Sequence, residues 1–165
     1  DAGMARHDPI PAALSLDGLS VDARGAFELA ADAGYRGIAF ATNHPELTPV
    51  NLGESARRHL RKLLDTRHLT IDALRVAAPR AGLSDPATID RTVDNARAAI
   101  QLAHELHVTT VALNVGPLSV ENSGGSGAVA ALRELAERAD AAGITLTALQ
   151  ALGLEDAALA RVITR

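Results

Sequence analysis

The chain has 165 residues, of which 47% are apolar but only 2% aromatic, so its hydrophobic core must be mostly aliphatic. The formal net charge of −4 and the absence of tryptophan argue against nucleic-acid binding through a basic surface or base stacking. Without cysteine it can form neither disulfides nor thiolate metal sites, which favours a cytoplasmic location, and no apolar run approaches the ~20 residues that cross a membrane.

The first predicted strand and helix follow a polar, proline-bearing lead over residues 1–11. The segment "AALSLDG" (12–18) is typical of a short strand. In "VDARGAFELAADAG" (21–34), apolar residues recur at helical spacing, and Ser20 is the predicted N-cap. The next segment, "GIAFAT" (37–42), predicts the second strand.

The second and third helices have clear start signals. Asn51, with Glu54 three residues later, resembles a capping box, while Asp85 followed by Pro86 supplies an N-cap and a proline suited to the first helical position. Between these helices, "TIDALRVAA" (70–78) predicts the third strand. The third helix is long, and its apolar residues recur every three or four positions at Ile89, Val93, Ala96, Ile100, Ala103 and Leu106.

The same alternation continues to the end of the chain. "TTVALNVG" (109–116) predicts a fourth strand, residues 128–142 a fourth helix and "GITLTALQA" (143–151) a fifth strand. The tail "LEDAALARVITR" suits one last helix. Five strand-then-helix cycles therefore form a single predicted domain over residues 12–165.

Regular alternation of this kind indicates an α/β fold whose parallel strands are joined by right-handed helical crossovers. Two architectures fit the pattern. One is a partial barrel with about five of the eight units of a (βα)8 barrel, and the other is an open doubly wound five-stranded sheet. In both, ligands bind at the carboxyl ends of the strands, so the residues there are the ones that bear on function.

The polar residues at these strand ends form a rim of hydrogen-bonding groups. The rim is poor in the paired carboxylates and histidines that acid–base or metal chemistry usually requires. Its members are Asp17 after the first strand, Asn43, His44 and Glu46 after the second, Arg75 late in the third with Arg80 in its loop, Asn114 in the fourth with Ser119 in its loop, and Gln150 at the end of the fifth.

Each candidate has a functional and a structural interpretation. His44, with Glu46 nearby, is a candidate general base or metal ligand, or else a loop histidine that serves the turn. Arg75 can bind a phosphate or carboxylate bidentately, or it can pair with a neighbouring acid. The candidate substrate-binding residues are Asn43, Arg75, Asn114 and Gln150.

Three segments resemble one known family. They are "AFELAADAGYRGIAF" (26–40), "ARRHLRKLLDTRHLTIDAL" (56–74) and "RTVDNARAAIQLAHELHVTTVALNVGP" (91–117). In order and spacing they resemble the xylose isomerase-like TIM-barrel superfamily, which includes sugar-phosphate isomerases and epimerases, hydroxypyruvate isomerase, inosose dehydratase and endonuclease IV. The similarity covers roughly residues 12–150 and implies the first five βα units of the barrel.

The resemblance also implies where a metal would bind. Family members with sugar-isomerase activity hold a divalent cation with carboxylates and a histidine at the ends of strands five to eight. Here the strand-five acid falls near Leu149 or Gln150, and the histidine common near the ends of strands three and four is replaced by Arg75 or Val76 and by Asn114. Since strands six to eight have no counterpart, we predict no complete metal site and no cofactor in this chain.

The resemblance therefore implies a sugar phosphate isomerase/epimerase-like protein that acts on or binds a small sugar or sugar phosphate, with its catalytic apparatus incomplete in this chain. The alternative is a non-catalytic binding or assembly module, in which the open sheet edges pair with a second copy or with a missing C-terminal half. A phosphoacceptor receiver domain is disfavoured, since it needs clustered acids after strand one and a lysine after strand five, where the chain has Asp17 alone and Gln150. A nucleotide-binding flavodoxin-like sheet stays open on fold grounds.

Overall fold

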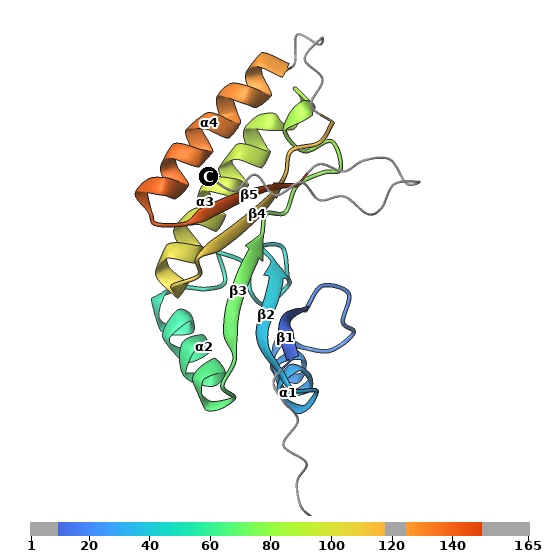
Figure 1. Cartoon of the computed structure of the whole chain (residues 1–165), viewed down its shortest axis with the longest axis vertical. Coiled ribbons are helices and arrows are strands. Elements are labelled where there is room, and N and C mark those ends of the chain that lie inside the picture. Colours follow the sequence, from blue (N-terminus) through green and yellow to red (C-terminus); the bar gives the residue numbers. More distant parts are fainter. Residues whose placement is uncertain (1–9, 118–124, 150–165) are drawn as a thin grey trace, which may run out of the picture.

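A computed structural model of the chain describes residues 10–117 and 125–149, which form five strands that alternate with helices (Figure 1). The strands are β1 (Ile10–Ser15), β2 (Tyr35–Ala41), β3 (Thr70–Arg75), β4 (Thr110–Asn114) and β5 (Thr145–Leu149). The helices are α1 (Ala23–Asp32), α2 (Glu54–Thr66), α3 (Ile89–Leu106) and α4 (Gly125–Ala141), with a 3₁₀ turn, η1 (Gly82–Ser84), between β3 and α3. The predicted alternation is confirmed over these residues, whereas the predicted last helix lies outside them.

The five strands form one parallel sheet in chain order, β1-β2-β3-β4-β5. A doubly wound sheet reverses its strand order about a switch point, so the doubly wound alternative is wrong. Right-handed crossovers that all advance in one direction place the helices on one side of the sheet. In Figure 1, α2, α3 and α4 lie along the same side, as in part of a (βα)8 barrel.

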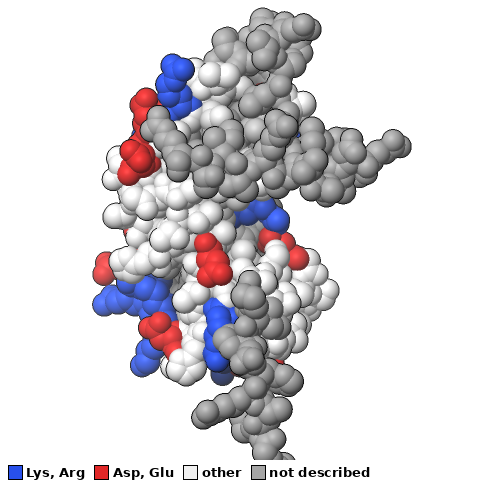
Figure 2. Space-filling view, in the orientation of Figure 1, with Lys and Arg blue, Asp and Glu red and all other residues white. Residues whose placement is uncertain are grey.

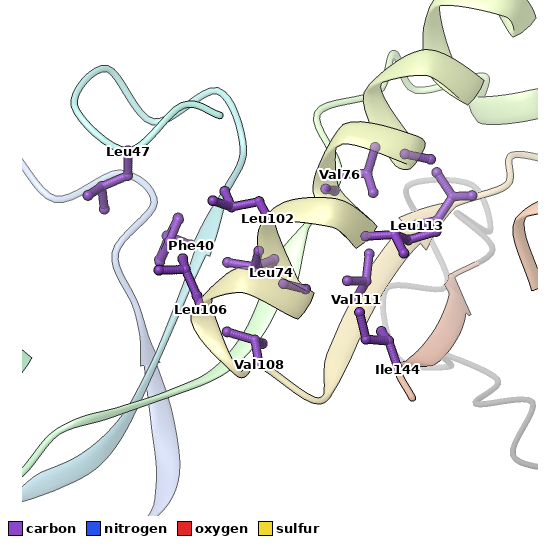
Figure 3. Packing of buried hydrophobic residues seen from close by; sticks show 14 of the residues in the cluster. Phe40, Leu47, Leu74, Val76, Leu102, Leu106, Val108, Val111, Leu113 and Ile144 are labelled. Atoms are coloured by element: carbon purple, nitrogen blue, oxygen red, sulfur yellow. The ribbon is translucent and has the colours of Figure 1, made fainter. Parts of the chain in front are cut away.

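The hydrophobic core lies between the sheet and the helices. Leu74 of β3 and Val111 of β4 are fully buried, and the close-up in Figure 3 shows Leu74 beside Leu102 and Leu106 of α3. The core is almost entirely aliphatic, as the composition requires, and Phe40 is one of its few aromatic members. Burial of these side chains drives the helices onto the sheet.

The opposite face of the sheet carries small side chains. Ala39 of β2 pairs in register with Ala73 of β3, and Arg75 at the end of β3 pairs with Ala112 of β4. Alternation along each strand places these residues on the face away from Phe40 and the core. Arg75 therefore stands at the carboxyl end of a face that carries Ala39, Ala73 and Ala112 beside it.

Helices α1, α2 and α3 begin at residues other than the predicted caps, and α3 starts after Thr88 rather than Asp85. Asp22, rather than Ser20, caps α1, and its carboxylate accepts a hydrogen bond of 2.7 Å from a first-turn N–H. Helix α2 begins after Gly53 rather than at Asn51. The reason is that the Asn51 side-chain amide donates instead to the Pro45 carbonyl at 2.9 Å and so secures the preceding loop.

Ion pairs join neighbouring helices on the outer surface. Arg97 of α3 donates two hydrogen bonds, of 3.0 and 2.8 Å, to Glu134 of α4, and Arg57 of α2 pairs with Glu105 of α3. Over the described part of the face in Figure 2, acidic and basic side chains lie beside one another rather than in separate regions. Among the described residues, no helix combines the length and the apolarity that crossing a bilayer would need.

Candidate functional site

The candidate site is built from strand ends that the parallel sheet brings to one edge. Asp17 lies two residues beyond the end of β1, Asn43 lies two residues beyond the end of β2, and Arg75 is the last residue of β3. Ala41 pairs in register with Arg75, so the ends of β2 and β3 lie at the same level. Residues far apart in the sequence therefore meet at the carboxyl edge of the sheet.

Asp17 is fixed by several hydrogen bonds. Its Oδ1 accepts from the Ala41 backbone N–H at 2.9 Å, and its Oδ2 accepts from the Ser15 hydroxyl at 3.1 Å. Arg75 Nη2 donates to the same Oδ2, which makes an ion pair between β3 and the β1 end. The side chain of Asp17 is 23% exposed and that of Arg75 is 50% exposed, so the guanidinium keeps a solvent-facing side.

The loop after β2 is anchored to helix α1. Glu46 Oε1 accepts a hydrogen bond of 3.2 Å from the backbone N–H of Ala23, the first residue of α1, where the helix dipole favours negative charge. The backbone N–H of His44 donates to the Ala41 carbonyl at 2.9 Å, and the His44 carbonyl accepts from Leu47 at 3.0 Å. The His44 ring Nδ1 also accepts a long hydrogen bond, 3.4 Å, from the Glu46 N–H.

These groups surround a hollow of about 400 Å³ at the ends of β1, β2 and β3. Four of the sequence-predicted residues line it together, namely Asn43, His44, Glu46 and Arg75, and Asp17 lies among them. The rest of the lining is mostly apolar and consists of Leu16, Gly18, Leu19, Val21, Ala41 and Pro45. The exposed surface of the hollow is nevertheless more polar than apolar, which suits hydrogen bonding to a polar ligand.

Asn114, another predicted substrate-binding residue, has a structural role. Asn114 Nδ2 donates to the carbonyls of Pro79 and Arg80 at 3.3 and 3.0 Å, and its Oδ1 accepts from the Gly116 N–H at 3.0 Å. These bonds tie the loop after β3 to the end of β4, and Asn114 is not part of the hollow's lining. Gln150 lies outside the described residues.

Two residues have roles that sequence reasoning did not assign. Asp17 was placed on the rim without a role, and its only signal is its position just after a strand. Thr42 is buried, its Oγ1 accepts from the Ala77 N–H at 3.0 Å, and its own N–H donates to the Arg75 carbonyl at 2.8 Å. Thr42 thereby holds the end of β2 against β3, yet in "GIAFAT" it reads only as a strand residue.

The described residues contain no cluster of side chains that could hold a metal ion. Hard cations favour several oxygen ligands, but within residues 10–117 and 125–149 no group of three or more histidine, aspartate or glutamate side chains lies close enough to hold one. At the hollow, Asp17 is committed to Arg75 and Glu46 to the α1 N-terminus. What the arrangement offers instead is hydrogen bonding to a polar ligand, with His44 as its one imidazole.

Comparisons with known proteins agree with this fold. The sequence profile described as "Xylose isomerase-like TIM barrel" matches residues 27–153, well over half of the chain. No curated protein sequence matches. Among solved structures, a xylose isomerase domain protein from Planctomyces limnophilus superposes with a TM-score of 0.71 at 16% identity, over 91% of this chain and 58% of that one.

Sugar epimerases are also structurally similar. An L-ribulose 3-epimerase matches with a TM-score of 0.58 at 28% identity, over 78% of this chain and 45% of that one. A D-tagatose 3-epimerase-like protein matches with a TM-score of 0.64 at 17% identity, over 86% and 53%. The chain thus spans about half the length of these structures. The profile match and the sequential parallel sheet together show that this chain belongs to the xylose isomerase-like TIM-barrel family.

Proposed function

We propose that the chain is part of a sugar isomerase/epimerase-like protein and that its hollow binds a small sugar or sugar phosphate. The observation that carries this proposal is the grouping of Asn43, His44, Glu46 and Arg75 around one hollow at the carboxyl edge of the sheet. A sugar presents hydroxyl groups that both donate and accept hydrogen bonds. Arg75 supplies donors, the carboxylates supply acceptors, and the Asn43 amide supplies both.

Turnover by an isomerase or epimerase needs a base that removes a proton from a carbon next to a carbonyl. Of the two candidates, His44 suits this role better, because Glu46 already accepts a hydrogen bond from α1. We propose that the chain binds its ligand without a metal or other cofactor. We also propose that its catalytic set is incomplete, and that it works in cytoplasmic carbohydrate metabolism.

Calorimetric titration with a panel of ketoses and ketose phosphates tests the binding site. We expect at least one saturable ligand, and we expect Arg75→Gln to weaken its binding about tenfold through loss of one charge-assisted hydrogen bond. Arg80→Gln is the matched control, since Arg80 is exposed and lies outside the lining. Absence of saturable binding, or an equal loss in both variants, would contradict the proposal. A melting temperature that rises with Mn²⁺ would contradict the metal-free part of it.

The open edges of the sheet favour a second candidate, a homo-oligomeric assembly module. Among the described strands, β1 pairs only with β2 and β5 only with β4. The Leu16 N–H donates to the Ala39 carbonyl at 2.8 Å, so alternation turns the backbone groups of Ala13 and Ser15 toward the free edge of β1. A two-fold axis parallel to the strands would place β5 of one copy beside β1 of the other in parallel orientation.

Light scattering on the eluting protein tests this assembly. If the edges pair, the chain elutes with a dimer's mass, and Ala13→Pro lowers that mass because proline removes an edge N–H. Glu54→Pro is the control, since it places proline at the first position of α2, where proline is tolerated. A monomeric parent chain, or a dimer that survives Ala13→Pro, would exclude pairing through β1.

A further inference from the structure

The charges that line the hollow are unequal. Asp17 and Glu46 bring two carboxylates, whereas Arg75 is the only guanidinium of the lining. The positive charge of Arg75 is already met by Asp17 through Nη2 and Oδ2. Arg80, the next basic residue along the chain, is not part of the lining. The hollow is therefore net negative, in a chain whose overall formal charge is also negative.

The net negative charge of the lining should weaken the binding of an anionic ligand. A phosphate that reached Arg75 would compete with the Asp17 carboxylate for the same guanidinium, and it would also lie in the field of Glu46. Like charges repel, and because Glu46 and Arg75 are solvent-exposed this repulsion is strongest at low salt. An uncharged hydroxyl meets no such repulsion. It can donate to a carboxylate oxygen and accept from one of the remaining guanidinium N–H groups.

From these contacts we infer that the hollow takes an uncharged sugar and discriminates against the corresponding sugar phosphate and sugar acid. The inference rests on the proposed function and narrows its substrate class. Asp17 is the specificity-determining residue, because it pairs with Arg75 and leaves the Glu46 carboxylate, held at the α1 N-terminus, with no cationic side chain among the lining residues to pair with. The interpretation of Arg75 as a phosphate-binding residue is thereby replaced by one in which Arg75 and Asp17 together bind hydroxyl groups.

Titration calorimetry with D-fructose and D-fructose 6-phosphate, and with D-tagatose and its 6-phosphate, tests this inference. At low salt we expect each free ketose to bind at least about tenfold more tightly than its phosphate ester. In Asp17→Asn the ratio should shift by about tenfold toward the ester, because Arg75 becomes available while the amide oxygen can still accept from the Ala41 N–H. The shift should shrink as salt is added.

Asp32→Asn is the charge-matched control. Asp32 ends α1, is exposed and lies outside the lining, so this variant should leave the ratio unchanged. The inference is overturned if the parent chain binds the esters more tightly than the free ketoses. It is also overturned if Asp17→Asn melts like the parent and leaves the ratio of the ketose and ester affinities unchanged. In both cases the proposed sugar site stands. A chain that binds neither free ketoses nor esters refutes the proposed function itself, and this inference with it.

Discussion

The two buried threonines of the described residues differ in one respect. The Thr42 hydroxyl accepts a hydrogen bond from the Ala77 N–H, whereas Thr92 Oγ1 has no hydrogen-bond partner among the described residues. A buried hydroxyl without a partner costs on the order of 1–3 kcal/mol. Removing a buried acceptor leaves the opposing N–H unsatisfied at a similar cost.

The same substitution should therefore have opposite effects at the two sites. We expect Thr92→Val to raise the free energy of unfolding by about 1 kcal/mol and Thr42→Val to lower it by about 1–2 kcal/mol. Urea unfolding followed by circular dichroism measures both values. Loss of stability in Thr92→Val would mean that its hydroxyl has a partner that stabilises the fold.

At the residue scale, the sequence predicts where the site residues lie better than it predicts which groups they contact. It placed Asn43, His44, Glu46 and Arg75 at strand ends, and these four do line one hollow. It left open whether Arg75 binds an anionic ligand or pairs with an acidic side chain of the protein. In the structure Arg75 pairs with Asp17, 58 positions away in the sequence. No local pattern encodes such a contact, because it depends on how the strands come together.

At the scale of the elements, the loop after β3 passes close to the loop after β4, and this close approach depends on two glycines. Gly116 has a φ of +71°, and a Cβ there would lie 1.9 Å from the Ala81 carbonyl oxygen. Gly82, with a φ of +57°, approaches the Asn114 carbonyl in the same way. The loops after β3 and β4 therefore pass each other with no room for side chains.

We expect Gly116→Ala to destabilise the chain by about 3 kcal/mol or more, since it combines a left-handed φ with a backbone clash. Gly53→Ala is the control, because Gly53 has a φ of −63° and open space where a Cβ would lie. The midpoint of thermal unfolding compares the two variants. Equal midpoints would show that the crossing can relax without cost.

The pairing of α3 with α4 should depend on pH. Two hydrogen bonds from Arg97 hold the pKa of Glu134 below its ordinary value. The folded state then binds this proton less readily than the unfolded chain does. The resulting stabilisation is present above the unfolded pKa, and it is lost as the pH falls from about 5 through the lowered folded pKa.

Replacing Arg97 should therefore flatten the acid side of the stability profile. Between about pH 7 and about pH 3.5, we expect the melting temperature of Arg97→Gln to fall less than that of the parent. This difference should shrink in high salt, because both side chains of the pair are solvent-accessible. Arg91→Gln, on an exposed position of α3, controls for the lost charge. Parallel profiles for all three proteins would show that this pair does not contribute.

At the element scale, the sequence predicts that each helix and strand exists, but it misplaces their ends. Asp85 was the predicted cap of α3, yet its carboxylate bonds to the Ala87 N–H at 3.0 Å and the Thr88 hydroxyl at 2.9 Å, which forms a separate turn. Helix α3 starts only after Thr88. Polar side chains near a helix start have several partners of similar energy, and tertiary packing decides among them.

For the whole molecule, the alternation of strands and helices was enough to predict a parallel sheet. It could not distinguish a partial barrel from a doubly wound sheet, because both use the same local units. The sequential strand order resolves this choice, and it is a property of the whole fold. The candidate site follows from that order, since only neighbouring strand ends can share one hollow.

The most direct test of the account is an amide chemical-shift titration of the ¹⁵N-labelled chain with D-fructose. A ligand in the proposed site should shift the amides of Asp17, Asn43 and Arg75 along one saturable curve. It should leave unchanged the amide shifts of Gln101 and His104, which line a second hollow of about 290 Å³ between α3 and α4. Saturable shifts confined to that second hollow, or none at the ends of β1 to β3, would contradict a sugar site at the carboxyl edge of the sheet.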